Sequence, residues 1–183
     1  KLRHICDFSI KKLMKSKGNI VFLGMMGSGK TSIGELVSKK LDLNFFDVDQ
    51  YIEDETKMKI SKIFSKEGET FFRELEEKKT LNLLNKKNSV ISLGGGAFLN
   101  QKIREEVLKN HLSFWLNLST EAIMSRIKNS SKRPIATKLT TDELRILIKK
   151  RSNIYSKAMY KIECDGLTKN EVVDKIINIY ETN

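Results

Sequence analysis

The sequence predicts an α/β domain in which a five-stranded parallel sheet carries helices on both faces. Three observations support this fold class. Short apolar runs alternate along the chain with longer stretches that have helical periodicity. The first apolar run leads through a glycine-rich loop into a helix, which is the usual βα arrangement of such domains. The chain has 183 residues, a length that suits one domain with a sizeable core.

The predicted strands are the apolar runs, and each is short enough to be a buried parallel strand. They share β-branched, leucine or aromatic residues and are bounded by polar residues or glycine. In chain order, their expected positions are about 19–24, 44–46, 89–93, 111–118 and 160–164.

The predicted helices are the amphipathic stretches between these strands. The helix after the glycine-rich loop takes its apolar stripe from Ile33, Leu36, Val37 and Leu41. A later long helix begins with acidic residues in its first turn, as the helix dipole favours. The expected helices after the first cover about 50–56, 60–66, 70–85, 100–109, 119–128, 141–158 and 168–181, with a break at Gly68.

Two segments lie outside this alternation. Residues 129–140 are polar and contain the only proline, Pro134, so we expect a mobile lid there. Residues 1–18 show only a weak helical pattern and begin with Lys rather than Met, so we expect an N-terminal extension or a remnant of a longer chain. The folded domain is expected to cover residues 19–183.

Composition narrows the class of protein. The formal net charge is +11, but nearly half of the excess lies in residues 1–18 and the other cations are mixed with acids. This distribution argues against dedicated nucleic-acid binding. No apolar run approaches the roughly 18 residues of a membrane span, and no secretory signal is visible. Cys6 and Cys164 lie far apart, as in a reducing compartment, so we expect a cytoplasmic protein with no nucleic-acid or membrane partner.

The most informative motif is Gly24-Met25-Met26-Gly27-Ser28-Gly29-Lys30-Thr31, which has the phosphate-loop pattern G-x-x-x-x-G-K-[ST]. It lies between a predicted strand and a predicted helix, where free N–H groups and the helix dipole favour an anion. Lys30 can reach the β- and γ-phosphates of a nucleotide, and the Thr31 hydroxyl can bind Mg²⁺. The alternative is a glycine-rich turn without a ligand.

Asp47 and Asp49 follow the second predicted strand, at the sheet edge where ligands collect. In an extended segment the two carboxylates would share one side. One could then hold Mg²⁺ while the other meets a substrate hydroxyl. The alternative is a helix cap, with Asp49 at the start of the helix near 50–56.

Three glycines, Gly94-Gly95-Gly96, end another strand at the same edge, where a ligand could approach bare backbone. The alternative is a sharp turn from strand to helix. Arg151 lies on the apolar stripe of its helix, so its guanidinium needs an anion, either a ligand or an internal partner such as Glu76. Arg73 is a further candidate, the alternative being an ordinary surface arginine. Arg133 in the expected lid could close over a transferring phosphate, the alternative being a solvated loop charge.

These pieces together resemble shikimate kinases. The matching motifs, in chain order, are the phosphate loop, Asp47-Val48-Asp49, Gly68-Glu69-Thr70-Phe71-Phe72-Arg73-Glu74-Leu75-Glu76, Gly94-Gly95-Gly96, Arg133-Pro134 and Arg151 to Tyr155. The resemblance covers about residues 19–181 and implies a P-loop kinase fold. It also implies ATP-dependent phosphorylation of the 3-hydroxyl of shikimate, giving shikimate 3-phosphate and ADP in aromatic amino acid biosynthesis.

The resemblance assigns roles to individual residues. Asp49, Lys30 and Arg133 would be catalytic, and Thr31 and Asp47 would bind Mg²⁺. Arg126 resembles a further nucleotide-side arginine of some members. ATP would be held by Gly27, Ser28, Gly29, Lys30, Thr31, Ser32 and Arg133, and shikimate by Asp49, Arg73, Gly94, Gly95, Gly96 and Arg151.

Two segments depart from the family pattern. Ile135-Ala136-Thr137 stands where leucines are common, and 165–170 lacks the basic residue that some members use near adenine. The alternatives are a kinase of another small hydroxy acid such as gluconate, a nucleoside monophosphate kinase, or a non-catalytic nucleotide-dependent switch. We expect a monomer whose partner is a small-molecule substrate.

Overall fold

The computed structural model of the protein describes residues 18–128 and 139–182. Residues 129–138 of the predicted lid, with Arg133 and Pro134, lie outside these residues, and so do residues 1–17 of the expected N-terminal extension. No helix in the described part of the chain is both long enough and apolar enough to cross a membrane.

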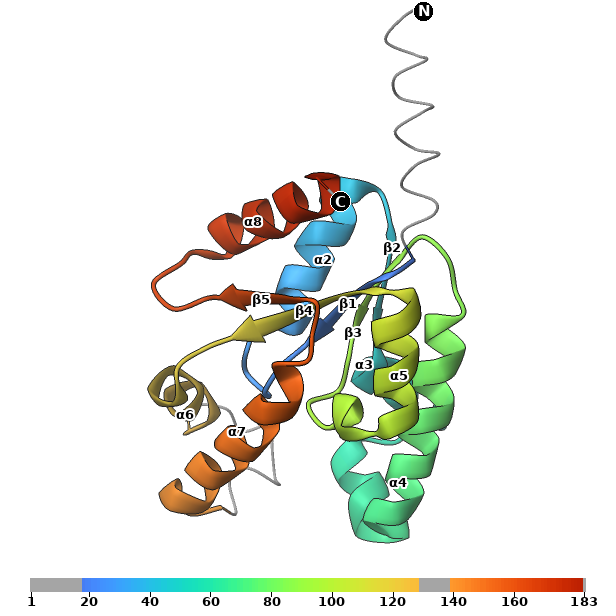
Figure 1. The fold of residues 1–183 in the computed structure, drawn as a ribbon. Helices are drawn as coiled ribbons and strands as arrows, with labels where there is room; N and C mark the ends of the chain where they lie inside the picture. Colours follow the sequence, from blue (N-terminus) through green and yellow to red (C-terminus); the bar gives the residue numbers. More distant parts are fainter. Residues whose placement is uncertain (1–17, 129–138, 183) are drawn as a thin grey trace, which may run out of the picture.

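The core of the fold is the predicted five-stranded parallel sheet (Figure 1). The strand order is β2-β3-β1-β4-β5, and every neighbouring pair is parallel. Each strand falls on its predicted segment, and the central strand β1 is buried along its whole length because it has a neighbour on each side and helices above and below. The strands are β1 (Ile20–Leu23), β2 (Asn44–Asp47), β3 (Ser89–Ser92), β4 (Leu112–Asn117) and β5 (Tyr160–Glu163).

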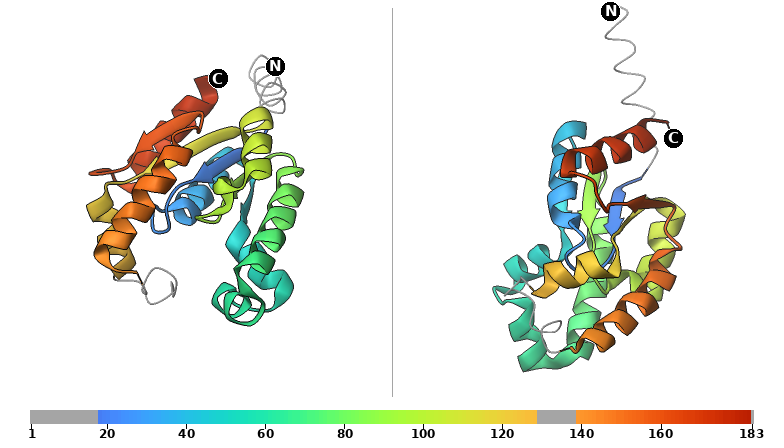
Figure 2. Two further views of the ribbon diagram at one scale, coloured as in Figure 1. Left: turned by 60° about the horizontal axis from the view of Figure 1, so that its bottom comes forward. Right: turned by 90° about the vertical axis from the view of Figure 1, so that its left-hand side faces the viewer.

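Helices cover both faces of the sheet, as predicted (Figure 2). Helices α2 and α8 contact each other on one face, while α4 and α5 contact each other on the opposite face. The helices are α2 (Lys30–Leu41), α3 (Val48–Thr56), α4 (Ile60–Leu84), α5 (Gln101–Asn110), α6 (Thr120–Lys128), α7 (Thr141–Tyr155) and α8 (Lys169–Thr182), with a short 3₁₀ helix at Ala97–Leu99 before α5.

The predicted helix break at Gly68 is confirmed as a kink inside α4. Gly68 has φ 83° and ψ 173°, values that a residue with a side chain rarely adopts. The helix continues on both sides of it, and the rings of Phe64 and Phe72 pack across the break with centroids 4.5 Å apart. The kink therefore redirects α4 without separating its two halves.

The prediction of an extended segment through Asp47 and Asp49 is wrong. Asp47 is the last residue of β2 and caps α3, because its Oδ1 accepts a hydrogen bond of 3.2 Å from the Gln50 N–H. Asp49 already lies in the first turn of α3. The helix begins before residue 50 because the cap is Asp47 and Val48 is fully buried against the core.

A buried polar junction joins the amino ends of the strands. Asn19, just before β1, donates from its side chain to Leu84 O and Lys86 O and accepts from Ser89 N. Its backbone N–H donates to His111 Nδ1 over 3.1 Å. Gly18 has φ +71° and its Cα lies against the Asn110 carbonyl, which a Cβ would meet at 2.1 Å. This end of the sheet is therefore fixed by side-chain to backbone contacts.

The His111 contact predicts a pH-dependent loss of stability. His111 is 8% exposed, and this burial lowers the pKa of its imidazole below the ordinary value, although the charge of Glu106 acts in the opposite direction. The Nδ1 atom must also stay unprotonated to accept the hydrogen bond from the Asn19 N–H. A lowered pKa favours the neutral form in the folded state. The stability that the neutral His111 contributes to the folded state is therefore complete above the pKa of the unfolded state, about 6.5. It is lost as the pH falls below that value.

We expect the free energy of unfolding to fall between pH 7.5 and 5.5 more steeply in the wild type than in His111→Asn, by at most about 1.4 kcal/mol per pH unit for one proton. Urea unfolding at a series of pH values measures both slopes. Since the two proteins share all carboxylates, the difference reports His111 alone, and parallel curves would contradict the assignment.

Candidate active site

The phosphate loop connects the carboxyl end of β1 to α2. Three of its glycines have positive φ: 141° at Gly24, 81° at Gly27 and 95° at Gly29. Lys30 Nζ folds back over the loop and donates to Gly24 O at 2.9 Å and to Met25 O at 3.0 Å. Gly29 is the N-cap of α2 and has no side chain to cap it, so the first N–H groups of the helix face the loop. The predicted anion site has the backbone shape that the motif requires.

Arg126 brings a further cation to this loop. It comes from α6, and its Nη1 donates to Gly27 O at 3.0 Å. The guanidinium therefore lies beside the phosphate loop, although the two segments are 99 positions apart in the chain.

Two oxygen ligands meet where β2 ends and α2 begins. Thr31 Oγ1 donates to Asp47 Oδ2 at 2.6 Å. A hydroxyl and a carboxylate are ligands that suit Mg²⁺, which takes one or two protein oxygens and completes its shell with water and phosphate. The part of the chain that the structure describes has no cluster of three or more His, Cys, Asp or Glu residues that could hold a metal without such help.

Side chains from three helices meet around the three glycines Gly94–Gly96. A Cβ on Gly94 would lie 2.6 Å from both Asp49 Oδ1 and Glu76 Oε1, and a Cβ on Gly96 would lie 2.6 Å from Arg73 Nη1. We expected a ligand to approach this backbone, but at Gly94 and Gly96 the close neighbours are side chains of the protein. Glycine is required at these two positions because any side chain would displace the carboxylates or the guanidinium.

Arg73 is held in place from several directions. Its Nη1 donates to Glu76 Oε2 at 2.7 Å, and its Nε and Nη2 donate to Glu69 Oε1 at 3.2 and 3.1 Å. Its guanidinium carbon also lies 5.7 Å from the ring centre of Phe64 and 5.2 Å from that of Phe72. Since these contacts fix the head group, little conformational entropy remains to be lost when an anion binds.

Glu76 is the buried partner of this arginine. It is 3% exposed, and burial raises the pKa of Glu76 while the charges of Arg73 and Arg151 act in the opposite direction. The internal ion pair that the sequence left open for Arg151 is therefore made by Arg73 instead.

Arg151 reaches the glycines from α7. Its Nη1 donates to Gly95 O at 3.2 Å, and a Cβ on Gly95 would lie 3.7 Å from the same nitrogen. Its Nε is buried and has no hydrogen-bond partner among the described residues. A buried donor of this kind is costly unless a ligand accepts from it, so Arg151 remains available to an anion.

Sequence reasoning proposed Glu76 only as a possible internal partner of Arg151, not of Arg73, and named Tyr155 only as part of a motif. The signal for Glu76 was present: it lies on the buried face of α4 with Phe72, Thr80 and Leu83, so a carboxylate there needs a cation. Tyr155 is 1% exposed and its hydroxyl donates to Gly95 O.

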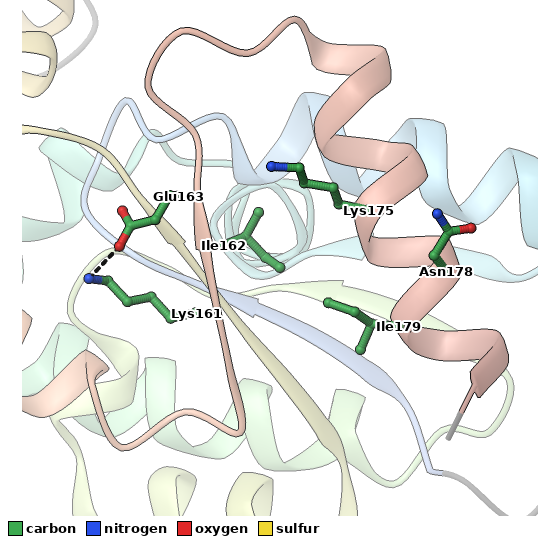
Figure 3. A pocket seen from close by; sticks show the side chains of 6 residues that line it. All are labelled: Lys161, Ile162, Glu163, Lys175, Asn178 and Ile179. Atoms are coloured by element: carbon green, nitrogen blue, oxygen red, sulfur yellow. Dashed lines mark ion pairs between the residues drawn. The ribbon is translucent and has the colours of Figure 1, made fainter.

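A cavity of about 390 Å³ lies between β5 and α8 (Figure 3). Its lining consists of Lys161, Ile162, Glu163, Lys175, Asn178 and Ile179. Lys161 and Glu163 form an ion pair of 2.5 Å beside it. None of the predicted site residues lines this cavity, so it is separate from the site built on the phosphate loop and the glycines.

Comparisons with known proteins agree on one family. The shikimate kinase family model matches residues 26–181 of the chain. The shikimate kinase of Thermodesulfovibrio yellowstonii is 43% identical over 164 residues, which make up 89% of this chain and 95% of the relative. The shikimate kinase of Bacillus subtilis is 42% identical over 161 residues, 87% of each chain. The solved structure of the Acinetobacter baumannii shikimate kinase in complex with shikimate has a TM-score of 0.87 at 31% identity, and the match covers 94% of this chain and 97% of that one.

Proposed function

Because this chain belongs to the shikimate kinase family, we propose that Gly24–Thr31 binds the ATP donor and that the side chains around Gly94–Gly96 bind the acceptor. The chain is a shikimate kinase, a phosphotransferase that uses ATP to phosphorylate shikimate in the shikimate pathway. The assignment of individual residues to this reaction is our proposal.

The observation that carries the proposal is that two half-sites meet at Gly95: the phosphate loop, which is the donor half-site, and the side chains around Gly94–Gly96, which are the acceptor half-site. A Cβ there would lie 3.4 Å from Met26 N in the phosphate loop and 3.7 Å from Arg151 Nη1. Arg73 lies over the next glycine. Two guanidinium groups beside a phosphate loop suit an acceptor with a carboxylate, because a planar guanidinium can bind both carboxylate oxygens.

Asp49 is our candidate for the group that takes the proton from the attacking hydroxyl. Its Oδ1 lies over Gly94, close to Glu76 and on the acceptor side of the site. A carboxylate in this place orients the hydroxyl and accepts its proton as the bond to phosphorus forms. Lys30 would stabilise the charge that develops on the transferring phosphoryl group, and we assign the same role to Arg133, which lies outside the described residues.

We assign Mg²⁺ binding to Thr31 and Asp47, because their oxygens already lie 2.6 Å apart beside the phosphate loop. The metal would supply positive charge next to the phosphate oxygens of ATP.

The test of the function is ADP formation with ATP, Mg²⁺ and a panel of acceptors. We expect shikimate to give a kcat/KM at least about 10²-fold above gluconate or a nucleoside monophosphate, because transfer needs the anion of the acceptor at the arginines and its hydroxyl at Asp49 at the same time, and a misplaced hydroxyl lowers the rate steeply. Samples with excess EDTA give the background. Turnover that gluconate or a nucleotide stimulates better than shikimate would refute the assignment.

A further inference from the structure

Tyr155 contacts both half-sites from the last position of α7. It is 1% exposed, and its hydroxyl donates to Gly95 O and lies 3.9 Å from Met25 Sδ. Met25 belongs to the phosphate loop, and Gly95 is the middle of the three glycines. The ring packs beside Trp115 of β4, with centroids 6.1 Å apart.

We propose that the Tyr155 hydroxyl is a positioning group that holds the Gly95 carbonyl against the phosphate loop and so sets the distance between Arg151 and the phosphoryl donor. It does not touch the reacting atoms in this role. The inference rests on the proposed function of Arg151 in acceptor binding.

The first support is that the Gly95 carbonyl oxygen accepts hydrogen bonds from two side chains of α7. Arg151 and Tyr155 are one helical turn apart and therefore project from the same face. Arg151 Nη1 donates to Gly95 O at 3.2 Å, and the Tyr155 hydroxyl donates to the same oxygen. A shift of Gly95 therefore moves the acceptor arginine as well.

The second support is the contact with Met25. The Met25 carbonyl accepts from Lys30 Nζ at 3.0 Å, so the residue that Tyr155 touches on the donor side also holds the phosphate-loop lysine. Tyr155 therefore contacts both Met25, whose carbonyl accepts from Lys30, and Gly95, whose carbonyl accepts from Arg151.

The third support is that the hydroxyl keeps its proton. Burial raises the pKa of Tyr155 to about 12, so the phenol stays neutral and remains a donor to Gly95 O at any pH at which the enzyme would work. A merely packed tyrosine would need only its ring beside Trp115 and Met25, and removal of the oxygen alone separates these two roles.

The experiment compares wild type with Tyr155→Phe, which keeps the ring and removes the oxygen. We expect kcat to fall about tenfold, because errors of less than 1 Å in the relative position of two substrates already lower the rate. The dissociation constants of ATP and of shikimate, each measured alone, should change by no more than about threefold, because each half-site keeps its own contacts. The fraction of folded enzyme is measured by thermal unfolding, and kcat is expressed per folded molecule.

Tyr180→Phe is the matched control. Tyr180 is 2% exposed in α8 and is not among the residues assigned to the site, so the same chemical change there should leave kcat unchanged. A wild-type kcat in Tyr155→Phe, or an equal loss in both variants, would overturn the inference. Arg151→Ala separates the two hypotheses: if it weakens shikimate binding while Tyr155→Phe has no effect, only the positioning role fails. If Arg151→Ala leaves the binding of shikimate unchanged, the proposed acceptor site itself is wrong, and the positioning role that rests on it is wrong as well.

Discussion

Replacement of Asp49 by Asn is expected to lower kcat by about 10²- to 10⁴-fold, the range that a positioned general base contributes. The amide has nearly the same shape as the carboxylate but cannot accept a proton at neutral pH. Asp49 lies over Gly94 on the acceptor side, whereas the phosphate loop is formed by a separate segment of the chain. The affinity for ATP should therefore stay within about threefold of wild type.

The measurement is single-turnover phosphoryl transfer together with ATP binding by calorimetry. Asp54→Asn is a suitable control because Asp54 lies on the same helix, is exposed, and contacts Gln50 rather than the glycines. Near-normal transfer by Asp49→Asn would remove this residue from the mechanism.

Replacement of Arg151 by Ala is expected to weaken shikimate binding by about 2–5 kcal/mol, the usual loss when one partner of a buried charged pair is truncated. This corresponds to roughly 30- to 5,000-fold in Kd. The structure supports a large value because Arg151 Nε is buried without a hydrogen-bond partner among the described residues, and because Glu76 already pairs with Arg73. A carboxylate of the substrate would supply the missing acceptor.

Titration with shikimate in the presence of ADP measures this effect. Arg145→Ala serves as the comparison, since Arg145 is exposed on the same helix and pairs only with Asp142 in the described structure. If both variants bind shikimate like the wild type, Arg151 has a structural role only.

Much of the fold could be predicted from local patterns, because β1, β3 and β4 are short, buried, mostly apolar runs and the helices between the strands are amphipathic. The phosphate loop could be predicted as well, since its glycines, lysine and threonine are contiguous. The error at Asp47 and Asp49 is also local. Only Val48 separates the two aspartates, and Asp47, whose carboxylate accepts from the Gln50 N–H, is the cap that determines where the helix begins.

The remaining features depend on contacts between distant segments. The Arg73–Glu76 pair has i,i+3 spacing within α4, so the sequence alone could have suggested it, whereas the contact of Arg151 with Gly95 depends on how α7 lies against the glycines. The need for glycine at Gly94 likewise depends on a carboxylate from α3 and another from α4 meeting above it. Sequence patterns therefore identified the candidate residues around Gly94–Gly96, whereas the contacts between residues of different segments are seen only in the tertiary structure.

The junction at Asn19 has a practical consequence for attaching this enzyme to other molecules. It lies at the amino ends of the strands, and α8 ends on the same side of the sheet, whereas the phosphate loop and the glycines lie at the carboxyl ends (Figure 1). A carrier or a solid support joined through Gly18 or after Thr182 would leave the substrate-binding edge facing the solution.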